Sequence, residues 1–394
     1  MNIKYFDHVA TTKLNSDVLN KMMPYLTNEY GNASSIYSLG RNTKKAVEDS
    51  RDIVAKILGA ESKEIYFTGC GSESDNTALK GVAIANKSKG NHIITSKIEH
   101  PAILETCKSL EKEGFDITYL NVDENGIVNL KELEDAITDK TILISIMFAN
   151  NEIGTIEPIE EIGNIALKHN IYFHTDAVQA VGAVDIDVNK LNIDMLSLSA
   201  HKFYGPKGVG VLYVRKTVKW NKFIDGGHQE KNKRAGTENV AGIVGLSSAM
   251  KMAYDKLEEN NKYLTNLRDY YISQIEEKIP YVKLNGHRTK RLPSNANISF
   301  KFIEGESLLL NLDLKGICAS SGSACTSGSL DPSHVLLAIG LIHEVAHGSL
   351  RISMGLDNTK EDVDYLINSL IEIVDRLRNM SPLYEDFVDG TYTM

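Results

Sequence analysis

Residues 197–210 read SLSAHKFYGPKGVG, and this segment decides how the rest of the chain is interpreted. The apolar run before it, Ile193–Leu198, predicts a strand, and a turn rich in Gly and Pro leads into a second strand at Val209–Val214. Lys202 therefore lies at a strand end. Partial desolvation there lowers the pKa of a lysine and frees its amine to attack a carbonyl group. The alternative is an ordinary solvated loop lysine.

The overall composition favours small-molecule chemistry. The 394 residues predict a large domain with a smaller one, and 42% hydrophobic with 24% charged residues is enough to build a core. The formal net charge of -9 argues against nucleic acid or an anionic membrane as a partner, because either would require a basic face. Neither a signal region nor a membrane-length apolar run is apparent, so we expect a cytoplasmic protein.

Short β-rich runs alternate with helical segments over residues 64–214, which predicts an α/β fold with a mostly parallel sheet covered by helices. The runs are Ile65–Thr68, His92–Thr95, Thr141–Phe148, Ile171–His174, Ile193–Leu198 and Val209–Val214. In such sheets, ligands bind beyond the carboxyl ends of the strands. The residues after each run are therefore the first candidates for a functional site.

Polar side chains follow strand after strand at this predicted edge. A Gly/Ser loop at residues 69–76 precedes a helical run at Thr77–Ala85, and a helix N-terminus offers backbone N–H groups to a phosphate. The later strand ends supply His100, Asn151, Asp176, Gln179, Ser199 and His201. Each alone has an ordinary explanation as a cap, a turn residue or a structural histidine. Together they match pyridoxal phosphate, which requires a phosphate cradle, a Schiff-base lysine and a carboxylate, here Asp176, that keeps the pyridine nitrogen protonated.

We expect three parts in the chain. Residues 1–15 form an N-terminal arm that joins the small domain, residues 16–255 form the large cofactor-binding domain, and residues 256–394 form a small C-terminal α/β domain. We expect the tail from Pro382 to be mobile or to contact a partner.

The four cysteines are too few and too scattered for a disulfide framework or a paired zinc pattern. Cys325 lies in Ser320–Ser329, which contains no large apolar residue and therefore predicts an exposed, mobile loop. A thiolate in such a loop can attack a ligand and then reach a partner. We expect Cys318, within the apolar sequence GICA, to lie in the core, and Cys70 to be a packed thiol.

The sequence HEVAH at residues 343–347 matches a zinc-protease pattern, which functions only on a helix. A glycine and a strand-like run, Ser349–Ser353, follow at once, and no third ligand is obvious, so we expect no structural metal. Arg351 in that run could hold a substrate carboxylate through its planar guanidinium or form a structural salt bridge. Thr237 in RAGTEN could contact phosphate or belong to a plain connector.

In these motifs, the chain resembles the cysteine desulfurases of the NifS/IscS type. The resemblance runs from FDHVATT to AHGSLRIS, which is nearly the whole chain. Its motifs are FTGCGSESDN, NNEIGT, HTDAVQA, SAHKFYGPKGVG, RAGTENVAGI and SSGSACTSGSLDPSHVL. It implies the fold-type I architecture of class V aminotransferases, with a mostly parallel seven-stranded-type sheet, bound pyridoxal phosphate and a homodimer.

The resemblance also implies residue roles. Lys202 would form the Schiff base, Asp176 would pair with the pyridinium, and His100 would stack on the ring and handle protons. The remaining cofactor contacts would come from Gly71, Ser72, Asn151, Gln179, Ser199, His201 and, from the other subunit, Thr237. Asn32 and Arg351 would orient the carboxylate of the substrate cysteine.

The implied activity is removal of sulfur from L-cysteine to give L-alanine and a persulfide on Cys325. The sulfur would pass to an iron–sulfur scaffold or to another acceptor protein, and Cys325 would touch an iron–sulfur cluster only transiently. The opening departs from the usual LDNNATT-like motif at His8 and Val9. The alternatives are a selenocysteine lyase or sulfinate desulfinase of the same fold, an ordinary aminotransferase, and the metallopeptidase suggested by HEVAH.

Overall fold

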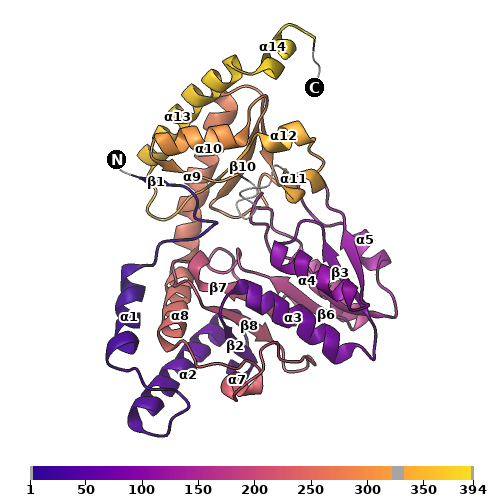
Figure 1. Ribbon diagram of the computed structural model, residues 1–394, viewed down its shortest axis with the longest axis vertical. Coiled ribbons are helices and arrows are strands. Elements are labelled where there is room, and N and C mark those ends of the chain that lie inside the picture. Colours follow the sequence, from indigo (N-terminus) through magenta and orange to yellow (C-terminus); the bar gives the residue numbers. More distant parts are fainter. Residues whose placement is uncertain (1–2, 322–331, 392–394) are drawn as a thin grey trace.

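The computed structural model describes residues 3–321 and 332–391 (Figure 1). Cys325 lies outside these ranges. Within them, a seven-stranded sheet with the order β2-β8-β7-β6-β5-β3-β4 forms the centre of the larger part. Its strands are β2 (Ile65–Thr68), β3 (His92–Ser96), β4 (Asp116–Leu120), β5 (Thr141–Ser145), β6 (Tyr172–Asp176), β7 (Met195–Ser199) and β8 (Gly210–Val214).

The strands from β7 to β4 are parallel, and β8 is antiparallel to both of its neighbours. The predicted mostly parallel sheet is therefore confirmed. The sequence analysis missed β4, because this edge strand is partly exposed and its polar residues hide the apolar pattern. The parallel arrangement brings the carboxyl ends of β5, β6 and β7 to one edge of the sheet.

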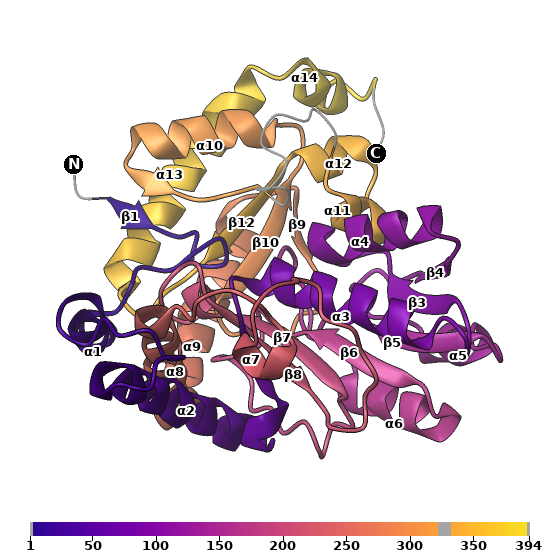
Figure 2. The same cartoon turned by 60° about the horizontal axis from the view of Figure 1, so that its bottom comes forward.

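Helices cover both faces of the sheet, as Figure 2 illustrates. On one face, α3 (Gly71–Asn86) and α4 (Pro101–Lys112) bury residues such as Leu79 and Ile103 against Ile93 and Leu143. The opposite face packs against α1 (Ser16–Thr27), α2 (Ser38–Leu58), α6 (Ile159–His169) and α8 (Val240–Asp255). Burial on both sides explains why the central strands are almost continuously apolar.

A second core is built on the antiparallel sheet β12-β10-β9. Its strands are β9 (Val282–Asn285), β10 (Asn295–Phe300) and β12 (Ser349–Ser353), covered by α9 (Leu257–Lys278), α10 (Gly305–Leu314) and α13 (Lys360–Asn379). The N-terminal arm joins this core: β1 (Lys4–Tyr5) pairs in parallel with β11 (Ile317–Cys318), and Phe6 is completely buried there. The shorter helices are η1 (Ser62–Glu64), α5 (Leu130–Asp135), η2 (Ala200–Lys202), α7 (Gln229–Asn232), α11 (His334–Ala338) and α12 (His343–His347).

The C-terminal tail contains a helix that the sequence analysis missed, α14 (Pro382–Val388). The rings of Tyr384 and Phe387 pack on Phe302, with centroid distances of 5.5 Å and 4.7 Å. This aromatic contact, rather than a long apolar run, holds the tail segment against the small core.

The HEVAH sequence forms the single short helix α12, which ends where Gly348 leads into β12. Across residues 3–321 and 332–391, no group of three or more His, Cys, Asp or Glu side chains is arranged to hold a metal ion. In the same ranges, no helix has both the length and the apolar character of a membrane span.

A buried ion pair holds a strained turn next to the large core. Arg51 on α2 donates from Nη1 and Nη2 to the two carboxylate oxygens of Glu230, at 2.7 Å and 2.8 Å. Glu230, Lys231 and Asn232 have φ values of 45°, 56° and 66°, in the left-handed region that non-glycine residues adopt at a cost. The ion pair therefore stabilises a backbone conformation that the sequence does not favour locally.

Replacing Glu230 by Ala should lower the free energy of unfolding by about 3–5 kcal/mol, because Arg51 would stay buried without its counter-charge. Denaturant unfolding measures the change. The matched control is Glu48→Ala, since the half-exposed Glu48 carboxylate contacts Arg51 Nε at 3.3 Å and should contribute at most about 1 kcal/mol. Equal losses in the two variants would contradict this account.

Candidate active site

A cleft of about 790 Å³ lies at the carboxyl ends of the central strands and collects most of the predicted site residues. The predicted residues that line it are Gly71, Ser72, His100, Asn151, Asp176, Gln179, Ser199, His201, Lys202 and Arg351. Asn32 and Thr237 are exposed and do not line the cleft of their own chain. The convergence predicted from strand order is therefore present in the fold.

Lys202 ends the 3-10 turn η2 that follows β7 directly. Its Nζ donates hydrogen bonds to the carbonyl oxygens of Val9, at 2.7 Å, and Ala10, at 2.9 Å. The same arm is fastened to this turn by Thr12, whose Oγ1 donates to the His201 carbonyl oxygen at 2.9 Å. The sequence analysis did not foresee that the N-terminal arm would hold the lysine, because the contact joins residues more than 190 positions apart.

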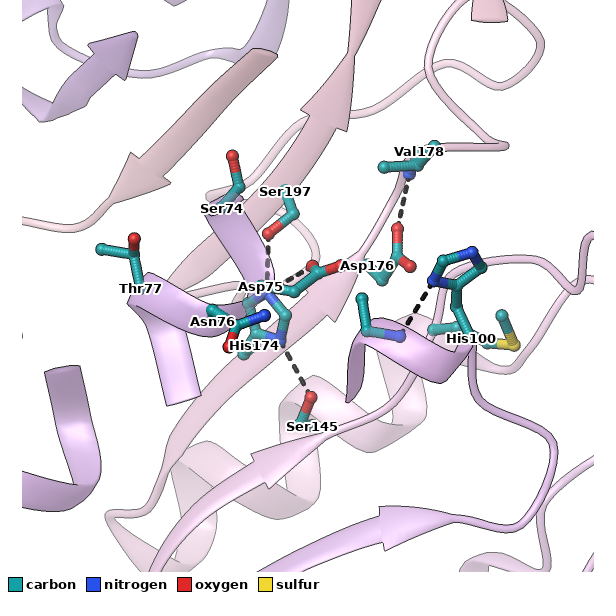
Figure 3. A network of polar contacts seen from close by, with 12 residues as sticks. Ser74, Asp75, Asn76, Thr77, His100, Ser145, His174, Asp176, Val178 and Ser197 are labelled. Atoms are coloured by element: carbon teal, nitrogen blue, oxygen red, sulfur yellow. Dashed lines mark hydrogen bonds and ion pairs between the residues drawn. The ribbon is translucent and has the colours of Figure 1, made fainter. Parts of the chain in front are cut away.

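Asp176 and His100 lie near one another at the floor of the cleft (Figure 3). Asp176 is buried at the end of β6 and accepts a hydrogen bond from the Val178 N–H at 2.9 Å. Burial raises the pKa of Asp176, while the nearby His100 and Lys202 act in the opposite direction. Burial also lowers the pKa of His100, which favours a neutral imidazole.

The imidazole of His100 is oriented by the start of α4. Its Nδ1 accepts a hydrogen bond from the Ala102 N–H at 3.1 Å, so His100 is the N-cap of this helix. The ordinary explanation considered for His100 was a structural histidine; its role as an N-cap was not predicted, and this hydrogen bond fixes the ring in the cleft wall.

The start of α3 has the form of a phosphate cradle. This helix begins at Gly71, six residues before the predicted run, so Gly71 and Ser72 occupy the first turn, whose N–H groups have no intrahelical acceptor. A Cβ on Gly71 would lie 2.7 Å from Val178 Cγ2. The missing side chain therefore allows Val178 to pack closely against the first turn of α3. With the buried Asp176 and the lysine, the arrangement fits pyridoxal phosphate.

Arg351 is buried at the opposite wall of the cleft. Its Nη2 donates to Asp7 Oδ1 at 2.9 Å and its Nη1 to the Asn151 carbonyl oxygen at 3.2 Å. Its Nε has no hydrogen-bond partner among the described residues. A structural salt bridge thus orients the guanidinium of Arg351, a residue that lines the cleft. The sequence analysis missed Asp7, whose only sequence signal is its place in the arm motif FDHVATT.

Two expectations about cysteines were wrong. We expected Cys70 to be a packed thiol. Instead it is exposed, occupies the N-cap position of α3 and lines the cleft. The glycines on both sides of it leave it little to pack against. Cys318 is only half-buried, because the two-residue strand β11 lies at the edge of the small core.

Comparison with known proteins decides the family. Residues 4–366 match the family Aminotransferase class-V. The chain is 60% identical to "Cysteine desulfurase IscS" of Clostridium botulinum over 98% of this chain and 97% of that one. It is 59% identical to the protein of the same name from Methanosarcina thermophila, over 96% and 94% of the two chains.

The chain belongs to the cysteine desulfurases of the aminotransferase class-V family. A solved "NIFS-like protein" has the same fold, with a TM-score of 0.90 and 40% identity over 95% of this chain and all of that one. Fold type I and dependence on pyridoxal phosphate follow from this membership. The comparisons therefore favour a desulfurase over the metallopeptidase that HEVAH suggested.

The desulfurase also contains a buried acid that the sequence analysis did not single out. Glu152 lines the cleft, and its Oε2 accepts a hydrogen bond from the hydroxyl of Ser333. Burial raises the pKa of Glu152 to about 7. Because glutamate in an unfolded chain titrates near about 4.3, folded Glu152 keeps a proton that the unfolded chain releases.

Glu152 should therefore make the desulfurase less stable as the pH rises from about 4.3 to about 7. In this window the unfolded chain binds fewer protons than the folded one, so the free energy of unfolding falls with pH. Glu152→Gln should remove this contribution and flatten the slope, measured by urea unfolding at several pH values. The exposed Glu124→Gln is the control. An unchanged slope in Glu152→Gln would contradict the assignment.

Proposed function

We propose that this cysteine desulfurase takes sulfur from L-cysteine, releases L-alanine and carries the sulfur as a persulfide on Cys325. One observation carries the proposal: a single cleft is lined by Lys202, Asp176 and Arg351, which supply an amine, a carboxylate and a guanidinium. Amine and carboxylate suit the cofactor, and the guanidinium suits the carboxylate of an amino acid.

Bound pyridoxal phosphate would supply an electron sink for negative charge on the substrate α-carbon. Lys202 would hold its aldehyde end, Asp176 would face the pyridine nitrogen, and His100 would contact the ring. The phosphate would lie against Gly71, Ser72, Ser199 and His201, and Asn151 and Gln179 would complete the ring contacts.

Arg351 would bind the substrate carboxylate through Nε and so place the α-carbon within reach of Lys202. The Lys202 amine would remove the α-proton and later return it. The carbonyl oxygens of Val9 and Ala10 support this role, because they accept hydrogen bonds from Nζ and so hold the amine in place. Because its Nδ1 accepts the Ala102 N–H, the neutral imidazole of His100 carries its proton on Nε2, which would be able to donate a hydrogen bond in the cleft.

Cys325 would attack the substrate sulfur as a thiolate. A sulfur–sulfur bond forms while the carbon–sulfur bond breaks, and the carbon fragment takes up a proton to become alanine. The residues on either side support this role. The Ser320 carbonyl oxygen accepts a hydrogen bond from the backbone N–H of Arg351 at 2.7 Å, and Ser333 lines the cleft. Cys325 is five and eight residues from these anchors, so the chain is long enough to reach the cleft.

Cys325→Ser should keep the visible absorbance of the bound cofactor and lose release of sulfide from L-cysteine, because the hydroxyl cannot accept the sulfur as a persulfide. Absorbance and sulfide release are measured on the same preparation. Lys202→Ala is the complementary variant and should lose the absorbance itself. Full activity in Cys325→Ser would rule out the proposed role of this thiol.

We also propose a homodimer. Large apolar side chains are exposed on α1 and the loop after it, which is typical of an interface. They are Leu19, Met23, Leu26, Tyr30, Ile36 and Tyr37, of which Ile36 is 90% exposed. Asn32 belongs to the same loop, and a dimer would allow Asn32 and Thr237 to reach the cleft of the partner.

Ile36→Asp should shift the protein from dimer to monomer, because a charge would have to be buried in the interface. Sedimentation velocity measures the change, and cofactor retention should fall with it. Ile342→Asp alters another exposed isoleucine, directly before α12, and should leave the dimer intact. A dimeric Ile36→Asp variant would place the interface elsewhere.

We propose that the persulfide sulfur passes, in the cytoplasm, to an iron–sulfur scaffold or to another acceptor protein. We further propose domain limits at residues 16–255 and 256–394, with the arm of residues 1–15 joining the second, supported by the burial of Phe6 in the small core. Following labelled sulfur from the persulfidated enzyme to candidate acceptors would identify the recipient.

A further inference from the structure

A second carboxyl group lies in the floor of the cleft beside Asp176. Asp75 is the fifth residue of α3, the helix whose first turn forms the phosphate cradle. It is 1% exposed and lines the cleft together with Asp176. The proposed function gives Asp75 no role, although only two residues separate Asp75 from Ser72 in the same helix.

Side chains from three neighbouring strands form a hydrogen-bonded row next to Asp75 (Figure 3). His174 on β6 contacts Ser145 on β5 through Nδ1, at 2.9 Å, and Ser197 on β7 through Nε2, at 3.0 Å. The same Nε2 lies 3.8 Å from Asp75 Oδ1. Burial lowers the pKa of His174 to about 3, so the imidazole is neutral and brings no positive charge.

The surroundings of Asp75 and Asp176 differ in charge. Asp176 has the Val178 N–H as a donor, and His100 and Lys202 both favour its ionised form. For Asp75, the neutral Ser197 hydroxyl is the one group that favours the ionised form. Its Oδ1 has no hydrogen-bond partner in the described part of the chain.

The other acidic groups near Asp75 make its ionisation still less favourable. Asp176 and Glu99 both face it with carboxyl groups, and burial together with these two acids raises the pKa of Asp75 well above its ordinary value. Two buried carboxyl groups that line one cleft and repel one another cannot both be ionised without a strong penalty. Since the Val178 N–H and the Lys202 amine favour a negative charge on Asp176, the proton belongs on Asp75.

We propose that Asp75 is a positioning residue of the cofactor site, which keeps a proton and so leaves Asp176 as the single negative charge of the pair. When Asp176 carries no charge, Asp75 ionises and partly replaces it. This inference rests on the proposed function, in which Asp176 faces the pyridine nitrogen of the cofactor. The two carboxyl groups then titrate as one unit.

A double-mutant cycle tests the proposal, with the dissociation constant for pyridoxal phosphate as its readout and denaturant unfolding as the check on folding. Asp75→Asn replaces a neutral acid by a neutral amide and should change affinity by no more than about twofold. Asp176→Asn should weaken binding on the order of tenfold or more. In the double variant, Asp75→Asn should cost about a further tenfold, because the substitute charge is gone.

Two outcomes of the cycle overturn the inference. Tenfold weaker binding in Asp75→Asn alone would mean that Asp75 is ionised in the wild-type enzyme. Equal affinities of Asp176→Asn and the double variant would mean that Asp75 does not replace the lost charge. If Asp176→Asn itself binds the cofactor like wild type, then the proposed role of Asp176, on which the inference rests, is wrong.

Infrared spectroscopy of the wild-type holoenzyme gives an answer that does not depend on any variant. With a carbon-13 label in the aspartate side chains only, the enzyme should show the carbonyl band of a protonated carboxylic acid, separate from the bands of Glu99 and the other glutamates. Absence of this band would overturn the proposal.

Discussion

The Lys202 amine is held by the carbonyl oxygens of Val9 and Ala10, and the rest of the site depends on this contact. It joins the carboxyl edge of the large sheet to an arm whose strand β1 pairs with β11 in the small core. The arm also supplies Asp7, which orients Arg351. One short segment therefore fixes both the amine and the guanidinium, so the two cores are aligned at the point where the chemistry takes place.

Burial controls the charges in this cleft. Glu152 and Glu99 have pKa values raised to about 7 and about 8, and His174 is kept neutral. At Asp176, the Val178 N–H and the nearby Lys202 act against the effect of burial and favour the ionised form. At buried positions, each remaining charge acts strongly on a bound ligand. The buried part of the site can thus present the carboxylate of Asp176 and the guanidinium of Arg351 with few competing charges.

The sequence predicted the parts of the fold and site that depend on local pattern. Buried strands, the Gly/Ser loop before a helix and the polar residues at strand ends were recognisable, since parallel strands bring their carboxyl ends together. Features that depend on contacts between distant parts of the chain were not recognisable in the sequence. The edge strand β4 lacks a clear apolar pattern, α14 is held by the aromatic Phe302, and Asp7 meets Arg351 only in the folded chain. Asn32 and Thr237 lie outside the cleft of their own chain, so the roles proposed for them would require a second subunit.

The central claim is that Lys202 is the residue to which the cofactor attaches. Reduction of the purified holoenzyme with borohydride makes this bond permanent, and mass spectrometry of its peptides then locates the added pyridoxyl group. The account predicts the label on the peptide that contains Lys202, with none on other lysines. A label on another lysine, or an unlabelled protein that nevertheless retains the cofactor, would contradict it.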